Sequence, residues 1–228
     1  MKLTNRLLKI ASLVTPNKRL ADIGTDHGYI PVYLLNKGII DYAILADINK
    51  GPLENARSEV NRNKLQDKVD LRLGSGIEVL KKGEVEEIII AGMGGILIGE
   101  LLEANKEVAK SSERLILQPM QAQEDLRIYL LNNGYEILDE CLEKEDFRLY
   151  EIIVAKYSGK NTKVEDEIYY EIGQKLIENK DELLVEFIDN KIKKYNNIIE
   201  KLGDKESEVV VSKRNFANDR IEKLNKLI

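Results

Sequence analysis

The chain has 228 residues, of which 43% are hydrophobic and 33% charged, and its formal net charge at pH 7 is −5. That length accommodates one α/β domain of about 150 residues with an appendage. Its single cysteine, Cys141, excludes an internal disulfide and a cysteine-based zinc site, so no metal is expected. No run approaches the roughly 18 apolar residues of a membrane span, and no signal peptide is recognisable, which indicates a cytoplasmic protein without a membrane partner.

Strands and helices are predicted to alternate over the first two thirds of the chain. Leu3, Leu7, Leu8 and Ile10 recur at helical spacing before Pro16. Buried strands are expected at 19–23, 42–46, 69–73, 87–91 and 114–117, with helices at 29–36, from Pro52 to about 63, after Gly95 and at 122–132. Such alternation predicts a doubly wound parallel sheet with right-handed crossovers.

Two further strands are expected at 135–142 and 148–154, with five residues between them. So short a connection has no room for a crossover helix, so these strands must form an antiparallel hairpin. A parallel five-stranded sheet that ends in a hairpin is typical of the Rossmann-like class I methyltransferase fold rather than of an all-parallel dinucleotide fold. The sequence therefore predicts an α/β methyltransferase domain over residues 1–157.

The composition changes after Tyr157, where 158–162 reads as a linker. Apolar residues then follow a spacing of three to four from Leu184 to Leu202, and after Gly203 a returning helix is expected over 209–228. Helices joined by a short connection pack antiparallel. Residues 158–228 are therefore predicted to form a helical hairpin, or coiled-coil-like domain. The alternative is an appendage that only stabilises the fold.

The segment Asp22-Ile23-Gly24-Thr25-Asp26-His27-Gly28-Tyr29 lies between the first strand and its helix. A dinucleotide fingerprint, G-x-G-x-x-G, would place its second glycine at position 26, where an aspartate would instead repel a pyrophosphate. S-adenosyl-L-methionine has no phosphate and carries ammonium and sulfonium groups, which acidic side chains suit. The loop therefore indicates S-adenosyl-L-methionine as cofactor and S-adenosyl-L-homocysteine as product; the alternative is an ordinary acidic turn.

Three later segments also follow strands. Asp47, followed by Ile48, stands 19 residues after Gly28, a spacing that suits contact with ribose hydroxyls, although such an aspartate can be a helix cap. Gly74-Ser75-Gly76 follows the third strand, where Ser75 can accept a hydrogen bond from the adenine amino group. Ala91-Gly92-Met93-Gly94-Gly95 follows the fourth strand, and its glycines indicate close approach of backbone to a ligand. Each glycine segment has a plain structural turn as its alternative.

These segments define the candidate site. The predicted cofactor-binding residues are Asp22, Gly24, Thr25, Asp26, His27, Gly28, Asp47, Ile48, Gly74, Ser75, Gly76, Ala91, Gly92 and Met93. Asp26 is the candidate catalytic residue, as acceptor of an amino proton. His27, the only histidine, is expected in the pocket or in a turn-stabilising role.

Two sequence features that other methyltransferases use are missing, and this narrows the atom that could be methylated. The Asn/Asp-Pro-Pro-aromatic motif of enzymes that methylate an exocyclic amine does not follow the fourth strand, and Cys141 is away from the cysteine nucleophile of pyrimidine C5 methylation. Cys141 is expected to be a buried small hydrophobe. A centre that is already nucleophilic remains, such as a ring nitrogen with an in-plane lone pair, for which positioning suffices.

The segments at 22–31 (DIGTDHGYIP), 90–95 (IAGMGG) and 116–119 (ILQP) together resemble the bacterial TrmK-type tRNA methyltransferases. That resemblance covers the whole chain and implies methylation of N1 of adenine 22 in tRNA. It implies cofactor contacts at Asp22, Gly24, Asp26, His27, Asp47, Ser75, Ala91 and Gly92, and a helical tail that helps to hold tRNA. Members often have Asp at the place of Ser75 and Asn at the place of Met120.

Charge places limits on how tRNA would bind. Residues 157–228 hold 14 Lys and Arg against 15 Asp and Glu, so any tRNA contact depends on local clusters such as Lys191, Lys193 and Lys194 or Lys213 and Arg214. Arg6, Lys9, Lys18 and Arg19 are expected to border the cleft. The alternatives are solvated charged faces, a methyltransferase for another RNA site or a small molecule, and a non-catalytic RNA-binding protein. A monomer is expected, because the returning helix can cover the tail's apolar stripe.

Overall fold

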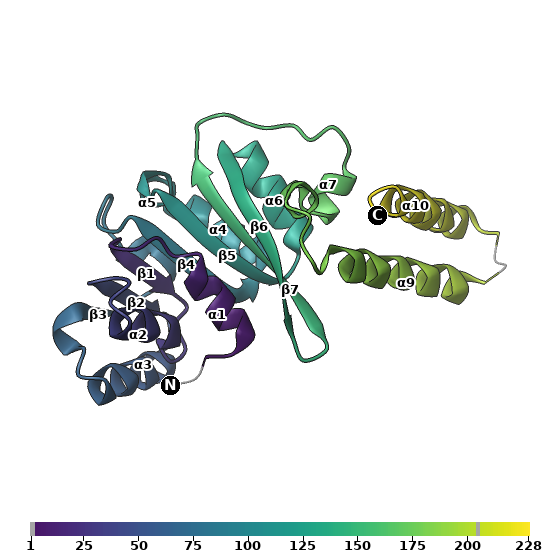
Figure 1. Ribbon diagram of the computed structural model, residues 1–228. Helices are drawn as coiled ribbons and strands as arrows, with labels where there is room; N and C mark the ends of the chain where they lie inside the picture. The colour runs from purple at the N-terminus through teal and green to yellow at the C-terminus, as the bar shows by residue number, and fades with distance from the viewer. Residues whose placement is uncertain (1–2, 204–205) are drawn as a thin grey trace. The chain divides into compact units, whose positions relative to one another are not determined.

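A computed structural model describes residues 3–203 and 206–228. Its centre is a seven-stranded sheet in the order β3-β2-β1-β4-β5-β7-β6 (Figure 1). The parallel strands are β1 (Leu20–Ile23), β2 (Ala43–Asp47), β3 (Val69–Leu73), β4 (Glu87–Gly94) and β5 (Arg114–Gln121). The last two strands, β6 (Tyr135–Glu145) and β7 (Arg148–Tyr157), pair antiparallel, and β7 is antiparallel to β5. The predicted methyltransferase-type sheet with a terminal hairpin is confirmed.

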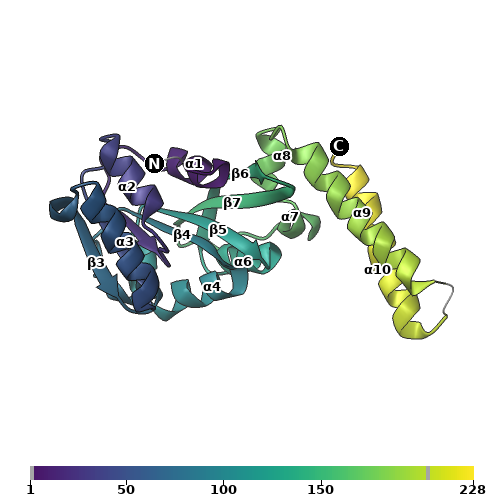
Figure 2. The same ribbon diagram turned by 90° about the horizontal axis from the view of Figure 1, so that it is seen from below.

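Helices cover both faces of this sheet (Figure 2). On one face lie α1 (Asn5–Ser12), α2 (Tyr29–Asn36) and α3 (Lys50–Arg62), whose buried side chains join those of the strands in one apolar cluster. On the other face lie η2 (Gly76–Val79), α4 (Gly95–Ala104), α5 (Lys106–Ser111) and α6 (Gln123–Asn132), in a second cluster. The short η1 (Gln66–Lys68) precedes β3. Strands buried on both faces explain why their sequences are continuous apolar runs.

Two strands, β4 and β5, are longer than predicted at their carboxyl ends. β4 was expected to end at residue 91 and β5 at 117, but they continue to Gly94 and Gln121. Their ladder is irregular there: Ala91 pairs with Gln118 and Met93 with Pro119, with a register shift between. Gly92 and Gly94 therefore belong to a distorted strand end rather than to a free loop, and Gly95 begins α4. An extra residue in a bulge stays unpaired and bends the strand.

A second compact unit comprises Val164–Ile228, the first being Met1–Lys163. The second contains α7 (Ile168–Glu171), α8 (Gln174–Glu178), α9 (Leu184–Leu202) and α10 (Glu208–Asn225). α9 and α10 pack side by side, with the Tyr195 and Phe216 rings 6.3 Å apart, so the predicted helical hairpin is present. Ser158 and Thr162, expected in a linker, donate backbone hydrogen bonds to Gly134 and Leu131 of the first unit.

Cys141 is buried in β6, as expected for a small hydrophobe. No helix within the described ranges is both long and apolar enough to cross a membrane. Over the same residues, no group of three or more His, Cys, Asp and Glu side chains is arranged to hold a metal ion.

Candidate active site

A cavity of about 420 Å³ opens at the carboxyl edge of the parallel strands. This is the edge at which doubly wound sheets bind nucleotide-like ligands. Three segments that are distant in the sequence form its walls: the start of α1, the loop from β1 into α2, and the end of β4. The lining residues are Arg6, Leu7, Asp22, Gly24, Thr25, Asp26, His27, Gly28, Tyr29, Ile30, Ala91 and Gly92.

The loop between β1 and α2 takes its shape from glycine. Gly28 has φ +66° at the N-cap of α2, and its N–H donates to the Thr25 hydroxyl at 3.0 Å. A Cβ at Gly28 would lie 2.5 Å from the Leu45 side chain. Both the left-handed backbone and the close packing therefore exclude a larger residue. Thr25 is buried and fixes the turn, so the loop is a rigid wall of the cavity.

Asp22, the residue before the last one of β1, lies in this wall and is only 8% exposed. Burial raises its pKa from 3.8 to about 6; a hydrogen bond with Thr25 works in the opposite direction, and the nearby carboxylate of Asp47 raises the pKa further. A buried carboxylate next to a second one favours a cationic ligand, since that ligand relieves both the desolvation and the repulsion. The ammonium group predicted from the acidic loop fits this environment.

Asp26 and His27 lie at the mouth of the cavity, and both side chains are solvent-accessible. Asp26 Oδ2 is 2.9 Å from His27 Nδ1. The His27 ring stacks on Tyr29, with centroids 4.8 Å apart and planes inclined by 15°. His27 therefore joins an acid to an aromatic surface at the entrance. The cavity and the turn-stabilising roles expected for it are both compatible with this position.

The end of β4 supplies the opposite wall. Gly92 has φ +81°, and a Cβ there would meet no other atom within 4 Å, so the cavity side of this residue is open. The neighbouring strand contributes Gln118, paired in register with Ala91 and fully buried. The sheet thus brings the 90–95 and 116–119 segments together, although residues 96–115 separate them along the chain.

The structure places eight of the predicted site residues on the cavity: Asp22, Gly24, Thr25, Asp26, His27, Gly28, Ala91 and Gly92. The other six, Asp47, Ile48, Gly74, Ser75, Gly76 and Met93, are not among its lining residues. Most of these follow β2 and β3, along the same carboxyl edge. Their part in cofactor binding stays a prediction.

Three of these outer residues have structural contacts within the protein: Asp47 in a turn, Ser75 in a helix cap and Met93 in packing. The Asp47 carboxylate accepts the Asn49 N–H at 2.6 Å, and Ser75 forms a reciprocal capping box with Glu78 at η2. Met93 packs its side chain over Gly24 and against the core. Capping and ligand binding do not exclude each other, because each carboxylate or hydroxyl oxygen accepts more than one hydrogen bond.

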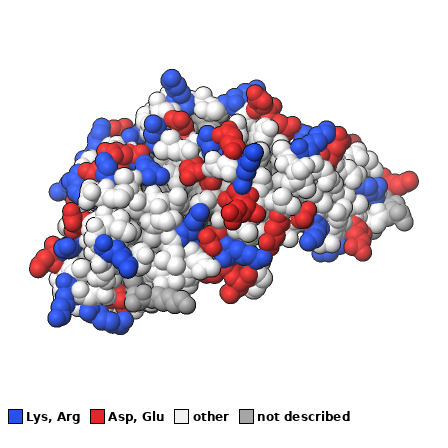
Figure 3. Space-filling view, in the orientation of Figure 1, with Lys and Arg blue, Asp and Glu red and all other residues white. Residues whose placement is uncertain are grey.

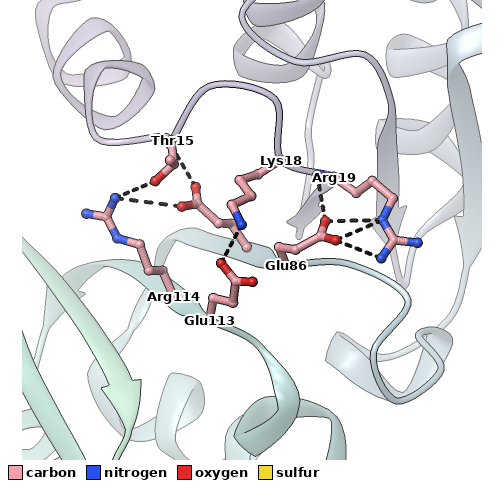
Figure 4. A network of polar contacts seen from close by, with 7 residues as sticks. Thr15, Lys18, Arg19, Glu86, Glu113 and Arg114 are labelled. Atoms are coloured by element: carbon pink, nitrogen blue, oxygen red, sulfur yellow. Dashed lines mark hydrogen bonds and ion pairs between the residues drawn. The ribbon is translucent and has the colours of Figure 1, made fainter.

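The prediction that Lys18 and Arg19 border the cleft is wrong. Both precede β1 and therefore lie at the amino edge of the sheet, opposite the cavity. Figure 4 shows them in a polar network there: Lys18 Nζ is 2.7 Å from Glu113, and Arg19 bonds Glu86 through its guanidinium and its backbone N–H. The direction of β1 decides at which edge of the sheet these two residues lie. Their position among the basic residues of the sequence does not show this edge by itself.

Of the four basic residues expected at the cleft, Arg6 alone lines the cavity. Leu7, Tyr29 and Ile30 also line it; Tyr29 ended the predicted cofactor loop, but none of the three was named as a binding residue. For Tyr29 and Ile30 a signal was present, since they directly follow the glycine loop. For Leu7 none was, because an apolar residue on an amphipathic helix is normally assigned to the core.

Comparison with known proteins agrees with this site. Residues 3–153 match the family model described as a methyltransferase domain. Over its full length the chain superposes on the crystal structure of the Bacillus subtilis m1A22 tRNA methyltransferase TrmK, with a TM-score of 0.89, 32% identity and 99% of that chain covered. The chain belongs to the TrmK family of methyltransferases.

A sequence alignment with the same Bacillus subtilis enzyme and one further structure add detail. The chain is 40% identical over 156 residues to the Bacillus subtilis tRNA (adenine(22)-N(1))-methyltransferase, an alignment that covers 68% of this chain and 66% of that enzyme. It also superposes on Streptococcus pneumoniae Sp1610 in complex with S-adenosyl-L-methionine, with a TM-score of 0.83, 30% identity and 99% of each chain covered. The superpositions cover both the methyltransferase domain and the helical tail of this chain.

Proposed function

We propose that this protein binds S-adenosyl-L-methionine in the cavity between α1, the glycine loop and the end of β4, and transfers its methyl group to N1 of adenine 22 in tRNA. The observation that carries the cofactor assignment is the buried Asp22 carboxylate beside a phosphate-excluding, acid-bearing glycine loop. The tRNA substrate is supported by membership of the TrmK family, whose Bacillus subtilis member is named for that reaction.

When bound, the cofactor supplies an activated methyl group on a sulfonium. The protein's contribution is to hold the adenine so that its N1 lone pair points along the axis of transfer, which by itself accounts for much of the acceleration. We assign Asp26 to the exocyclic amino group: its carboxylate would accept an N–H whose acidity increases as N1 is alkylated. Its exposed position at the mouth, held by His27, suits contact with a base that enters from solvent.

The second unit supplies a surface for the tRNA backbone. On one face of α9, a recess is lined by Asn190, Lys193, Lys194, Asn197, Ile198 and Lys201. Lys193 and Lys194 are exposed, whereas Lys191 lies 3.8 Å from Glu171 and Arg214 donates to the Gly203 carbonyl. We therefore propose as phosphate contacts Lys193 and Lys194 from the predicted clusters, together with Lys201, which lines the same recess but was not predicted.

Over the molecular face that Figure 3 draws, basic and acidic side chains are interspersed rather than gathered into one basic field. Affinity for tRNA would then come from a few local contacts combined with the fit of the target base, with little long-range attraction from a protein of net charge −5. A tRNA substrate would place the enzyme in the cytoplasm, and we expect it to act as a monomer.

The deciding experiment incubates the protein with radiolabelled S-adenosyl-L-methionine and unmodified tRNA, then digests the tRNA and maps the labelled nucleoside. We expect 1-methyladenosine at position 22, and no transfer to a tRNA with guanosine at that position. Absence of transfer to any tRNA contradicts the enzyme assignment, and a different labelled nucleoside contradicts the choice of target. The Asp26→Asn variant is expected to bind the cofactor but to lower the rate of transfer about 10²-fold or more.

A further inference from the structure

The turn between β6 and β7 presents an aromatic ring to solvent. Asp146 and Phe147 form this two-residue turn, and the residues on either side of it, Glu145 and Arg148, pair in register. Phe147 is 83% exposed, the highest value among the exposed large hydrophobic side chains of the described chain. Two-residue hairpin turns favour glycine and asparagine. A phenylalanine that stays in water gains nothing from burial, so neither the turn nor the core explains this ring.

The turn lies at the same edge of the sheet as the cavity. β7 is antiparallel to both β5 and β6, so β6 ends where the parallel strands end. β7 pairs with β5 over residues 153–155, and the hairpin projects past that ladder (Figure 1). The Glu145 carboxylate accepts the backbone N–H of Arg6 in α1 at 3.3 Å, and Arg6 lines the cavity. Phe147 follows Glu145 by two residues, about 7 Å of extended chain, so its ring lies near the mouth of the cavity.

Charged side chains surround this ring. Lys144, Asp146 and Arg148 are all exposed. The guanidinium carbon of Arg148 lies 5.4 Å from the centroid of the Phe147 ring. Docking of a protein partner uses a contiguous apolar patch of several hundred Å² or more, which one ring among charges does not provide. A nucleobase needs only one face of an aromatic ring, and an arginine next to that ring suits the phosphate that comes with the base.

The proposed substrate provides such a base. N1 of adenine is on the Watson–Crick edge, so a base pair or a stack hides it from an enzyme. Enzymes that act on such an atom take the nucleotide out of its stack. Its neighbour then has an uncovered face, and inserted or stacked apolar side chains can cover a face of this kind.

We propose that Phe147 stacks on a nucleobase adjacent to the target adenine of the tRNA, with Arg148 at the neighbouring phosphate. This inference rests on the proposed function and adds to it a tRNA contact in the first compact unit, separate from the recess on α9. The hairpin would hold the strand while the target base enters the cavity. Because one aromatic face accepts any base, the contact supplies affinity and position rather than sequence selection.

Tryptophan fluorescence tests the stacking directly, because the chain has no tryptophan of its own. Phe147→Trp keeps an aromatic ring at the turn and makes it the single tryptophan of the protein. Titration with unmodified tRNA is expected to quench its emission, with saturation at the Kd that filter binding gives. Gln66→Trp is the matched control, since Gln66 is exposed in η1 before β3, at the amino edge, and its emission should not change. Absence of quenching at Trp-substituted position 147 under saturating tRNA overturns the proposal.

Two further variants separate stacking from general apolar contact. Phe147→Ala and Phe147→Leu are each expected to raise Kd for tRNA about tenfold, because leucine retains apolar volume but has no aromatic face. Kd for S-adenosyl-L-homocysteine should stay within about twofold, which shows that the cavity is intact. Wild-type affinity for tRNA in Phe147→Leu overturns the proposal, as does a loss of self-association in place of tRNA affinity. If the wild type binds and methylates tRNA but these variants match it, only this inference fails; if the wild type does not bind tRNA, the proposed substrate fails and the inference with it.

Discussion

Asp22 illustrates how one residue obtains a function from its surroundings. The side chain is an ordinary acid in sequence, but at the end of β1 it is buried, and this raises its pKa to about 6. A ligand ammonium favours the ionised carboxylate. Below that pKa the carboxyl is protonated and the attraction is lost; above it the attraction is fully present.

Affinity for S-adenosyl-L-homocysteine should therefore rise with pH. From the pKa of about 6, Kd is expected to be about tenfold weaker at pH 5 than at pH 7, measured by calorimetry across that window. Asp22→Asn should bind more weakly and show no such slope, because the amide does not titrate. Asp41→Asn, an exposed acid between α2 and β2, is the control and should keep the wild-type slope. A flat wild-type profile would contradict the assignment of the ammonium to Asp22.

At the scale of elements, a buried ion cluster joins α6 to the terminal hairpin. Arg127 Nε is 2.7 Å from Glu140 in β6, and its Nη2 is 2.6 Å from Glu151 in β7. All three side chains are less than 5% exposed. Such a cluster adds little net stability over apolar packing, but loss of one partner leaves uncompensated buried charge.

Arg127→Met is accordingly expected to lower the free energy of unfolding by about 3–5 kcal/mol, as measured by urea denaturation, because two carboxylates would stay buried without a cation. The control is Arg62→Met. Arg62 also lies 2.7 Å from a glutamate, Glu59, but its side chain is 74% exposed, so the loss should be below about 1 kcal/mol. Similar losses in the two variants would show that burial is not what makes the cluster matter.

At the scale of the whole molecule, catalysis and tRNA contact are assigned to different compact units, residues 1–163 and 164–228. Such a division predicts that each activity can be impaired without the other. Reversing Lys193, Lys194 and Lys201 to Glu should weaken tRNA binding and reduce the slope of log K against log salt by about 2, while Kd for S-adenosyl-L-homocysteine is unchanged. Filter binding at several salt concentrations measures the slope.

The charge reversal itself needs a control at lysines of the first unit, outside the α9 recess. Lys37, Lys64 and Lys68 are exposed and follow or precede elements at the amino edge of the sheet, opposite the cavity. Their reversal to Glu alters the net charge equally and should leave the salt slope near that of the wild type. An equal effect of both triple variants would mean that net charge, rather than the α9 face, governs tRNA binding.

Much of this protein was predictable from sequence because its signals are local. The apolar runs gave the strands, and α2 and β3 have the bounds predicted for them. The short connection predicted before Arg148 required the antiparallel hairpin, which the structure has with β6 extended to Glu145. The loop from Asp22 to Tyr29 indicated its ligand through its glycine spacing and acids, and the structure places that loop on the cavity.

What the sequence could not determine depends on which distant residues the fold brings together. Strand direction sends Lys18 and Arg19 to the amino edge, while the packing of α1 beside the hairpin brings Arg6 to the cavity. The pairing of β4 with β5 sets Gln118 beside Ala91. These are long-range contacts, fixed by burial of both faces of the sheet rather than by any neighbour in the chain. Thus the sequence alone determined the fold class and the cofactor loop, and tertiary structure decided which charges face the ligand.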